Sequence, residues 1–537
     1  MEPLRRRDAR APPNGAHGRC VALTGLDPRR YHPLSRRDAS PMNTAPVDAA
    51  AAPRGAVTAE AAAARSPRSS PLPRAAAIVV AAVFVVLELA SFAGSGPPRR
   101  FNDTNGYMRV SEAPLASRAF LAGTRPIAVP LLYRALAQRD ATIVRAQSVL
   151  SVAGWLALAL SFAGLLRVRW VAGLAAAAVC AFSLVVPVNQ WDWVLLSESL
   201  SLSLFAAAAA LSLRLAAAGG AGRAPGKGLV AAWGACCLLF ALTRDVNVYV
   251  LACGWALLAV LAARAAIARG WRSPDARWRA SCLLVLTVVL GASQLLATNS
   301  GRWKLPLLNV LLRRVISSPE VADEFASRYG MPRNPEVARY AGRFGWHRVG
   351  GREPMVVRFF TDDPALADFR AWILERGVAS YARYLVVDQP MRALRVAAHA
   401  FATHGGQAAP NRRYGKGAGS TGWTRALSRV LHPQLPRPVL LWTLLVAAGA
   451  LLAWRSPAAR VPAAAVLLLA VTVAAHAFIA YHGDASNVDR HIAFAGIGLR
   501  LGLLLLLLTL LDRIAARTSG PGAGPPAANQ SPGSAGA

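Results

Sequence analysis

The chain has 537 residues, of which 54% are hydrophobic, and its formal net charge at pH 7 is +33. A mean hydropathy of +0.35 excludes an ordinary soluble globular domain and is typical of a polytopic membrane protein. The arginines that supply the charge are spread over tails and interhelical loops and are not concentrated in one module. We therefore predict that they anchor the chain at a membrane and that nucleic acid is not a partner.

Cysteine usage excludes two common ways of holding a fold together. Only Cys20 lies in a polar region, and the other five cysteines lie inside apolar runs: Cys180, Cys236, Cys237, Cys253 and Cys282. This distribution gives neither a disulfide framework nor the ligand spacing of a zinc site. We expect no cofactor; a divalent metal stays open, without a residue pattern that supports it.

The N-terminal part combines a polar tail with a first apolar run. Residues 1–74 are rich in Arg, Pro and Ala, show no apolar periodicity, and are predicted to form a disordered basic cytoplasmic tail. The run 75–93 is about long enough to span a bilayer and lacks signal-peptide architecture, so we expect an uncleaved signal anchor. If translation starts at Met42, much of the tail is absent from the protein, which N-terminal peptide sequencing would establish.

Apolar runs of roughly 17 to 25 residues, the length that crosses a bilayer, recur about ten times. The predicted spans are 75–94, 142–165, 169–187, 193–213, 228–243, 246–266, 279–298, 438–454, 461–481 and 491–512. A shorter candidate, 127–137, is expected at the interface or as a re-entrant segment. The prediction is an all-α polytopic membrane protein with these parts: an N-terminal transmembrane core 75–299 of about seven helices with an outer first loop 95–140, an outer helical segment 300–437 between the seventh and eighth helices, transmembrane helices 438–512, and a disordered tail 513–537.

Lysine and arginine in the short loops predict the orientation of the chain. If the N-terminus is cytoplasmic, the outer short loops hold only Arg244 and Arg490. The inner loops then hold Arg167, Arg169, Arg214, Arg223, Lys227, Arg264, Arg269, Arg272, Arg277, Arg279, Arg455 and Arg460. Both termini are therefore predicted to be cytoplasmic, in the plasma (inner) membrane, with the active face on the other side. The first outer loop breaks this rule, and we expect its arginines to be available for a phosphate: Arg99, Arg100, Arg109, Arg118 and Arg125.

The long outer segment is expected to be folded. Pro319 at a first helical position and Gly330 just past the last one bracket one helix. Asp363 opens a second helix that runs toward Tyr384. Residues 391–401 alternate apolar side chains with arginines, which predicts a helix along the membrane surface.

Polar side chains at the predicted outer helix ends are candidates for a site, and each has a structural alternative. Asp103 follows the first span in a sequence that also suits a solvated turn. Glu198, about one and a half turns inside the fourth predicted helix, is equally explained by hydrogen bonds across the bundle. Arg490 at the head of the last helix can hold a lipid phosphate or extend to the headgroups. Trp191 and Trp193 are expected to be interfacial anchors. The other candidates for substrate binding are Tyr107, Arg125, Asp192, Arg244, Asp489 and His491.

Five short motifs together resemble the GT-C superfamily, the integral-membrane glycosyltransferases that use polyprenyl-phosphate sugars. They are Asp103 with Tyr107, Thr124-Arg125-Pro126, Leu196-Ser197-Glu198, Leu242-Thr243-Arg244 and Asp489-Arg490-His491. The resemblance covers roughly residues 75 to 512 and departs from the family in having one isolated first-loop Asp in place of a paired acidic motif.

The resemblance implies transfer of a sugar from a polyprenyl-phosphate donor to an unknown acceptor, with membrane lipid as the surroundings. Asp103 is then expected to be the general base, Glu198 to orient the acceptor, and the arginines to hold the donor phosphate. Two alternatives remain. One is a transporter or flippase for a lipid-linked or anionic substrate, although the sequence shows no internal repeat or broken helix. The other is a noncatalytic membrane assembly protein.

Overall fold

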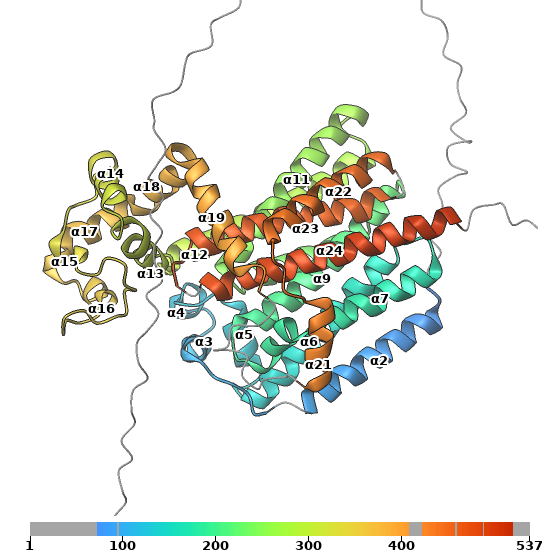
Figure 1. Cartoon of the computed structure of the whole chain (residues 1–537), viewed down its shortest axis with the longest axis horizontal. Coiled ribbons are helices and arrows are strands. Elements are labelled where there is room, and N and C mark those ends of the chain that lie inside the picture. The colour runs from blue at the N-terminus through green and yellow to red at the C-terminus, as the bar shows by residue number, and fades with distance from the viewer. Residues whose placement is uncertain (1–71, 94–95, 408–420, 457–458, 487, 519–537) are drawn as a thin grey trace, which may run out of the picture. The chain divides into compact units, whose positions relative to one another are not determined.

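The computed structural model describes residues 72–93, 96–407, 421–456, 459–486 and 488–518 (Figure 1). The predicted tail 1–74 lies outside this part of the chain except for its last three residues. In the described residues every regular element is a helix, and two isolated bridges are the only strand-like pairings. The chain is an all-α polytopic membrane protein, as the sequence predicts.

Three groups of helices make up the fold. The bundle contains α2 (Arg74–Ala93), α6 (Asp140–Ala163), α7 (Arg169–Ser183), α9 (Ser197–Gly220), α10 (Lys227–Ala241), α11 (Asp245–Arg269), α12 (Pro274–Ser300), α22 (Pro438–Arg455), α23 (Arg460–His482) and α24 (Val488–Thr518). Short helices at its ends are α3 (Asn102–Glu112), α4 (Arg118–Leu121), α5 (Ala128–Ala135), α8 (Val186–Asn189) and α21 (Gly422–Leu431). The outer segment contains α13 (Lys304–Val310), α14 (Pro319–Tyr329), α15 (Pro335–Ala338), α16 (Met355–Phe360), α17 (Ala367–Trp372), α18 (Val378–Arg383) and α19 (Pro390–His404).

Among the described residues, eight helices are long and apolar enough to cross a membrane, fewer than the ten predicted. They are α2, α6, α9, α11, α12, α22, α23 and α24. The predicted span 169–187 is broken: α7 ends at Ser183, and the following pair of α8 with the turn Gln190–Trp193 is bent from it by 54°. The predicted span 228–243 is α10, whose 15 residues rise only about 22 Å, less than the hydrocarbon thickness. At the other end of the chain, α24 continues to Thr518, so the transmembrane part does not end at residue 512.

Close helix packing holds the bundle together. Helix α6 packs along α9, and α23 packs along α24. At the crossing of α6 and α9, a Cβ on Gly154 would lie 2.4 Å from the backbone oxygen of Ser203, so only glycine allows this approach. By contrast, Val79 and Val86 on α2 are 60% and 62% exposed, which suits contact with lipid chains.

The basic interhelical loops gather at one end of the bundle, which we call the basic end. Gly219, at the end of α9, lies against Trp278 near the start of α12, and Gly220 lies against Val461 near the start of α23. The loop after α6 contacts the end of α24 through a hydrogen bond from Arg167 to Asp512. The opposite end, which carries α3, is called the α3 end. Which end faces the cytoplasm remains the prediction from loop charge.

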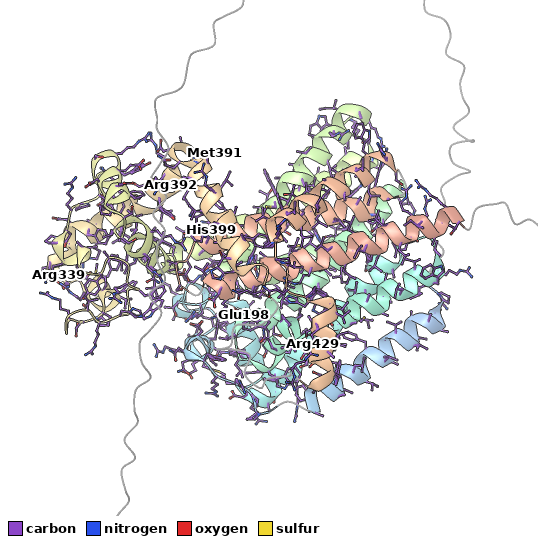
Figure 2. The ribbon with its side chains drawn as sticks, in the orientation of Figure 1. Glu198, Arg339, Met391, Arg392, His399 and Arg429 are labelled. Carbon is purple, nitrogen blue, oxygen red and sulfur yellow. The ribbon has the colours of Figure 1, made fainter. Side chains whose placement is uncertain are left out.

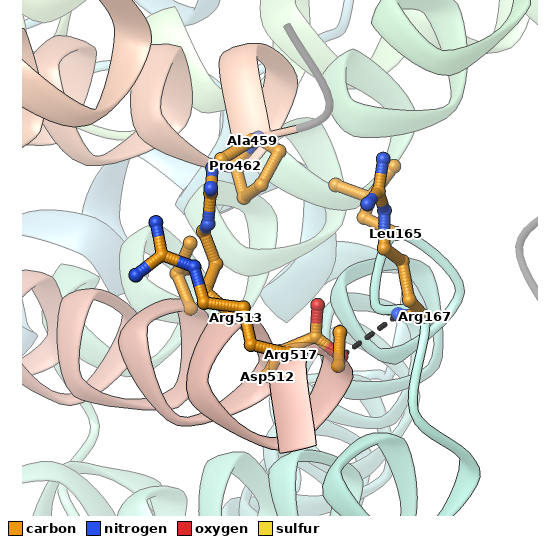
Figure 3. A pocket seen from close by; sticks show the side chains of 9 residues that line it. Leu165, Arg167, Ala459, Pro462, Asp512, Arg513 and Arg517 are labelled. Carbon is orange, nitrogen blue, oxygen red and sulfur yellow. Dashed lines mark hydrogen bonds between the residues drawn. The ribbon is translucent and has the colours of Figure 1, made fainter. Parts of the chain in front are cut away.

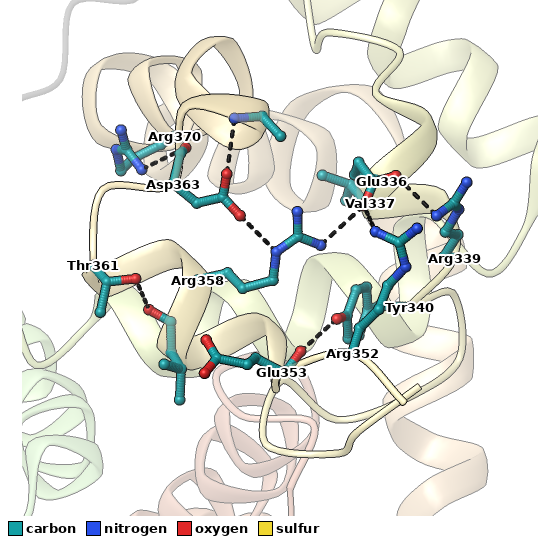
Figure 4. A network of polar contacts seen from close by, with 12 residues as sticks. Glu336, Val337, Arg339, Tyr340, Arg352, Glu353, Arg358, Thr361, Asp363 and Arg370 are labelled. Atoms are coloured by element: carbon teal, nitrogen blue, oxygen red, sulfur yellow. Dashed lines mark hydrogen bonds and ion pairs between the residues drawn. The ribbon is translucent and has the colours of Figure 1, made fainter. Parts of the chain in front are cut away.

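The outer segment is folded, as predicted, around its own apolar core. Helix α14 begins at Pro319 and ends before Gly330, whose φ of +67° is the left-handed conformation that terminates helices. Glu336 accepts from Arg352 and Arg358 in a network of ion pairs (Figure 4). The helical stretch opened by Asp363 is interrupted by two π-helical turns, Ile373–Gly377 and Tyr384–Asp388.

Helix α19 connects this segment to the bundle. It packs against α22, α23 and α24, so it is more than a helix resting on a membrane surface. The ring of His482 at the end of α23 contacts the Ala393 carbonyl at 3.0 Å and the Tyr381 hydroxyl at 3.2 Å. Figure 2 shows Glu198 within the bundle and Met391, Arg392 and His399 along α19.

Candidate functional site at the α3 end

One guanidinium joins the two carboxylates that the sequence singles out. Arg490, in the first turn of α24, donates from Nε to Glu198 Oε1 at 2.6 Å, and its Nη2 lies 2.5 Å from the same oxygen. Its Nη1 donates to Asp103 Oδ2 at 3.0 Å. The site therefore connects α3, α9 and α24. The grouping of Asp103, Glu198 and Arg490 expected from the sequence is present in the structure.

Glu198 lies in the first turn of α9 and not one and a half turns inside a helix, because α9 begins at Ser197. The residues before it are held extended: Arg99 donates its N–H to the Trp193 carbonyl at 3.0 Å and accepts from Leu195 N–H at 3.0 Å. The carboxylate of Glu198 is fully buried and lies at the positive end of the α9 dipole. The sequence pattern did not show this pairing across the chain, so the predicted helix started too early.

Arg244 supplies a second positive charge to Glu198. Its Nη1 lies 3.3 Å from Glu198 Oε1, and its Nη2 donates to His491 Nδ1 at 2.7 Å. Because a guanidinium only donates, His491 accepts through Nδ1 and carries its proton on Nε2, which lies 3.7 Å from Asp484. Asp245 does not pair with Arg244; it accepts from Arg302 at 2.8 Å.

Asp103 and Arg125 form the accessible edge of the site. Arg125 donates to Asp103 Oδ1 at 2.7 Å, and the two side chains are 31% and 37% exposed. Arg125 also stacks 5.2 Å from the ring centre of Tyr107, which is buried. A Cβ on Gly106 would lie 2.7 Å from Arg125 Nε, so the glycine lets this side chain lie against α3. Burial acts to raise the pKa of the Asp103 carboxyl, but attraction by Arg125 and Arg490 outweighs it and lowers that pKa.

Two further candidates, Asp489 and Asp192, lie in different parts of the structure. Asp489 lies beside Arg490 in the first turn of α24 and is half-buried. Asp192 is buried in a separate polar cluster, where it accepts a short hydrogen bond from Ser199. In the same cluster Glu88 accepts from Asn189 at 3.0 Å. We did not single out Glu88 in the sequence, although a lone carboxylate in the first apolar run was a signal for it.

The tryptophans beside Asp192 are not interfacial anchors. Trp191 and Trp193 are both 2% exposed, and Trp193 packs against Phe92 of α2 with ring centres 5.2 Å apart. They belong to the bundle core because the turn Gln190–Trp193 packs against α6 and α9. The aromatic pattern alone did not distinguish a core position from an interfacial one.

A small apolar cavity of about 50 Å³ lies beneath the buried half of the site. Its lining includes His476 and Phe494, and the guanidinium of Arg244 stacks 4.9 Å from the ring centre of Phe494. His476 Nε2 lies 3.0 Å from the carbonyl oxygen of His491. In the described part of the chain, no three His, Cys, Asp or Glu side chains lie close enough together to hold a metal ion.

In this arrangement the guanidiniums of Arg490 and Arg244 hold the buried carboxylate of Glu198. Arg490 also contacts Asp103, which forms a partly exposed pair with Arg125. Such a site can bind an anion at its edge and can exchange a proton through Asp103. Comparisons of the chain with protein-family models, with curated proteins and with solved structures gave no match.

Proposed function

We propose that the chain is a membrane glycosyltransferase that moves a sugar from a polyprenyl-phosphate donor to an acceptor glycan, lipid or protein on the non-cytoplasmic face. The observation that carries the proposal is Arg490 shared between Asp103 and Glu198. It puts a candidate base and a candidate phosphate ligand within one hydrogen bond of each other. The short motifs that resemble the GT-C superfamily supply the residues of this contact.

In the proposed reaction, Asp103 takes the proton from an acceptor hydroxyl while the acceptor oxygen bonds to the sugar carbon. The bond from that carbon to the donor phosphate breaks, and the polyprenyl phosphate leaves with the electron pair. Arginine neutralises the negative charge that develops on the leaving oxygen, and this role does not require a metal ion. Because the pKa of Asp103 is lowered by Arg125 and Arg490, the carboxylate is a weak base until the donor phosphate draws a guanidinium from it.

The geometry favours different roles for the arginines. Arg125 is the most exposed of the three, so it is the first proposed contact for the phosphate. Arg490 and Arg244 are buried and held by Glu198, which has no exposed surface. We therefore assign Glu198 to fixing these two arginines, in place of the acceptor-orienting role inferred from the resemblance.

The test is transfer of radiolabelled sugar from a polyprenyl phosphate by the purified full-length protein. We expect Asp103→Asn to keep the fold and to lower the rate of transfer by about 10²- to 10⁴-fold, the usual contribution of a general base. Glu112→Gln is the matched control, because it removes an exposed carboxylate at the end of the same helix. Full activity of Asp103→Asn would remove Asp103 from the mechanism.

A transporter or flippase is the second candidate, and one observation favours it. The broken pair of α7 with α8 is a feature that the sequence did not show, and broken helices are common at transport sites. Buried Glu88, Asn189 and Asp192 lie at or beside the break. The same labelled donor separates the candidates. Movement of the lipid across a vesicle membrane without chemical change supports transport. The absence of both transfer and movement supports the noncatalytic assembly protein.

A further inference from the structure

A second charged site lies at the basic end of the bundle, far from Asp103. A cavity of about 100 Å³ is lined there by residues of α24, the start of α23 and the loop after α6 (Figure 3). Its charged lining residues are Arg167, Asp512, Arg513 and Arg517. Arg490 and Arg513 belong to the same helix, 23 residues apart, which is about 34 Å along the axis. This separation is close to the thickness of a bilayer, so the two sites lie at opposite membrane surfaces.

The arginines of the cavity outnumber its carboxylates. Asp512, the one carboxylate among the described residues of the lining, accepts the backbone N–H groups of Arg167 at 2.9 Å and Val168 at 2.8 Å. Within the described residues, no carboxylate lies within ion-pair distance of the guanidinium of Arg167, Arg513 or Arg517. Three positive charges therefore face one negative charge, whose Oδ1 accepts two backbone hydrogen bonds, and an anion would relieve the repulsion among the arginines.

Two further features point to an anionic ligand. Nη1 of Arg513 is buried and has no hydrogen-bond partner among the described residues, which is costly for a charged donor. In addition, Ala459 and Pro462 at the start of α23 line the cavity, and Ala459, the cap residue of this 23-residue helix, has no side chain that could accept from the N–H groups of the first turn. The positive end of the helix dipole therefore adds to the arginines.

The size and place of the cavity define the chemical class of the ligand. A cavity of about 150 Å³ accepts a molecule as large as benzene, so about 100 Å³ suits one phosphate group better than a whole sugar. Trp170 and Trp454, 57% and 83% exposed, lie at the same end of the bundle and are typical of the level of lipid headgroups. We propose that this cavity binds a phosphate group, supplied either by an anionic membrane lipid or by soluble phosphate.

This inference does not rest on the glycosyl transfer proposed above, since none of its residues belongs to the Asp103 site. Arg513 supplies the buried donor, Arg517 and Arg167 supply long-range attraction, and Asp512 holds the loop after α6 in place. Binding of the phosphate group would connect this loop to the end of α24. We expect it to stabilise the bundle by mass action, because the unfolded chain has no such site.

The test measures the thermal midpoint of the purified full-length protein in neutral detergent at constant ionic strength. Three titrants are compared: short-chain phosphatidylglycerol, short-chain phosphatidylcholine and inorganic phosphate. We expect the midpoint to rise with phosphatidylglycerol more than with phosphatidylcholine. A rise with phosphatidylglycerol alone identifies a lipid headgroup, and an equal rise with inorganic phosphate identifies the soluble group.

Arg513→Gln is expected to raise the concentration for the half-maximal shift by about tenfold or more, the loss of one charge-assisted hydrogen bond. Arg517→Gln, which alters an exposed side chain, gives a second reading if Arg513→Gln does not fold. Arg223→Gln is the matched control, because this exposed arginine lies at the same end and does not line the cavity. The proposal is overturned if all three titrants act alike, or if the cavity variants respond as the wild type does.

Discussion

The contact between Arg490 and Glu198 gives a quantitative prediction about stability. Glu198 Oε1 receives Arg490 through two nitrogens, at 2.6 Å and 2.5 Å, and Arg244 at 3.3 Å, with no exposed surface on the carboxylate. Breaking a buried ion pair by removing one partner costs about 3 to 5 kcal/mol, because the remaining charge stays buried. Glu198→Gln keeps the size of the side chain and leaves two guanidiniums without their shared charge. We expect it to destabilise the protein by about 3 kcal/mol.

The double variant separates the ion pair from its surroundings. In Glu198→Gln/Arg490→Gln no buried charge is left facing a neutral partner, apart from Arg244. We expect the double variant to cost less than the sum of the two single variants, with an interaction energy of at least about 2 kcal/mol. The free energy of unfolding in mixed detergent micelles, followed by tryptophan fluorescence, measures all four corners of the cycle.

The matched control is an ion pair of similar geometry at an exposed position. Arg100 contacts both oxygens of Asp140 at 2.7 Å, but the arginine is 52% exposed. We expect the same cycle at this pair to give an interaction energy of about 1 kcal/mol or less. If the buried pair gives no more than the exposed one, burial does not strengthen this contact and the argument is wrong.

Two further predictions concern other charged groups. Arg500 donates to the carbonyl oxygens of Pro433, Gly405, Gly406, Gln407 and Gly496. A lysine ammonium cannot reproduce this planar set of donors. We therefore expect Arg500→Lys to lower the free energy of unfolding by about 2 kcal/mol or more. A change near zero would show that the contacts are dispensable. The second concerns pH: since the folded-state pKa of Asp103 lies below the ordinary 3.8, its pairing stabilises the protein above pH 3.8 and is lost as the pH falls through the folded value. The stability difference between wild type and Asp103→Asn, about 1 kcal/mol or less for this partly exposed group, should shrink below pH 3.8 in acid unfolding, and a difference that grows there would contradict the sign.

Much of the architecture follows from local sequence, and the limits of that reasoning have physical causes. Apolar runs predict most membrane helices because length and hydropathy are local quantities. The break after Ser183 has a local signal in Pro187, which lies in the first turn of α8 and cannot continue a helix from α7. The start of α9 depends on a backbone pairing with Arg99, which is not visible in a window of neighbouring residues, so the depth of Glu198 was wrong.

The members of the site were predictable, but their contacts were not. Loop charge put Asp103, Arg244 and Arg490 on one predicted face, and the structure brings them together around Glu198. Asp192 was grouped with them because it also lies near a helix end, yet its carboxylate turns toward Ser199. Which partner a side chain finds is decided by tertiary packing.

The hydrogen bond between Arg490 and Asp103 joins residues that lie 387 positions apart in the sequence. At a synthesis rate of about 5 to 20 residues per second, Asp103 leaves the ribosomal active centre roughly 20 to 80 seconds before Arg490 is added. During that interval the first-loop carboxylate lacks the guanidinium that links it to Glu198. The site is therefore completed last in biosynthesis, and a chain that stops before α24 has every earlier residue of the site but not the contact that unites them.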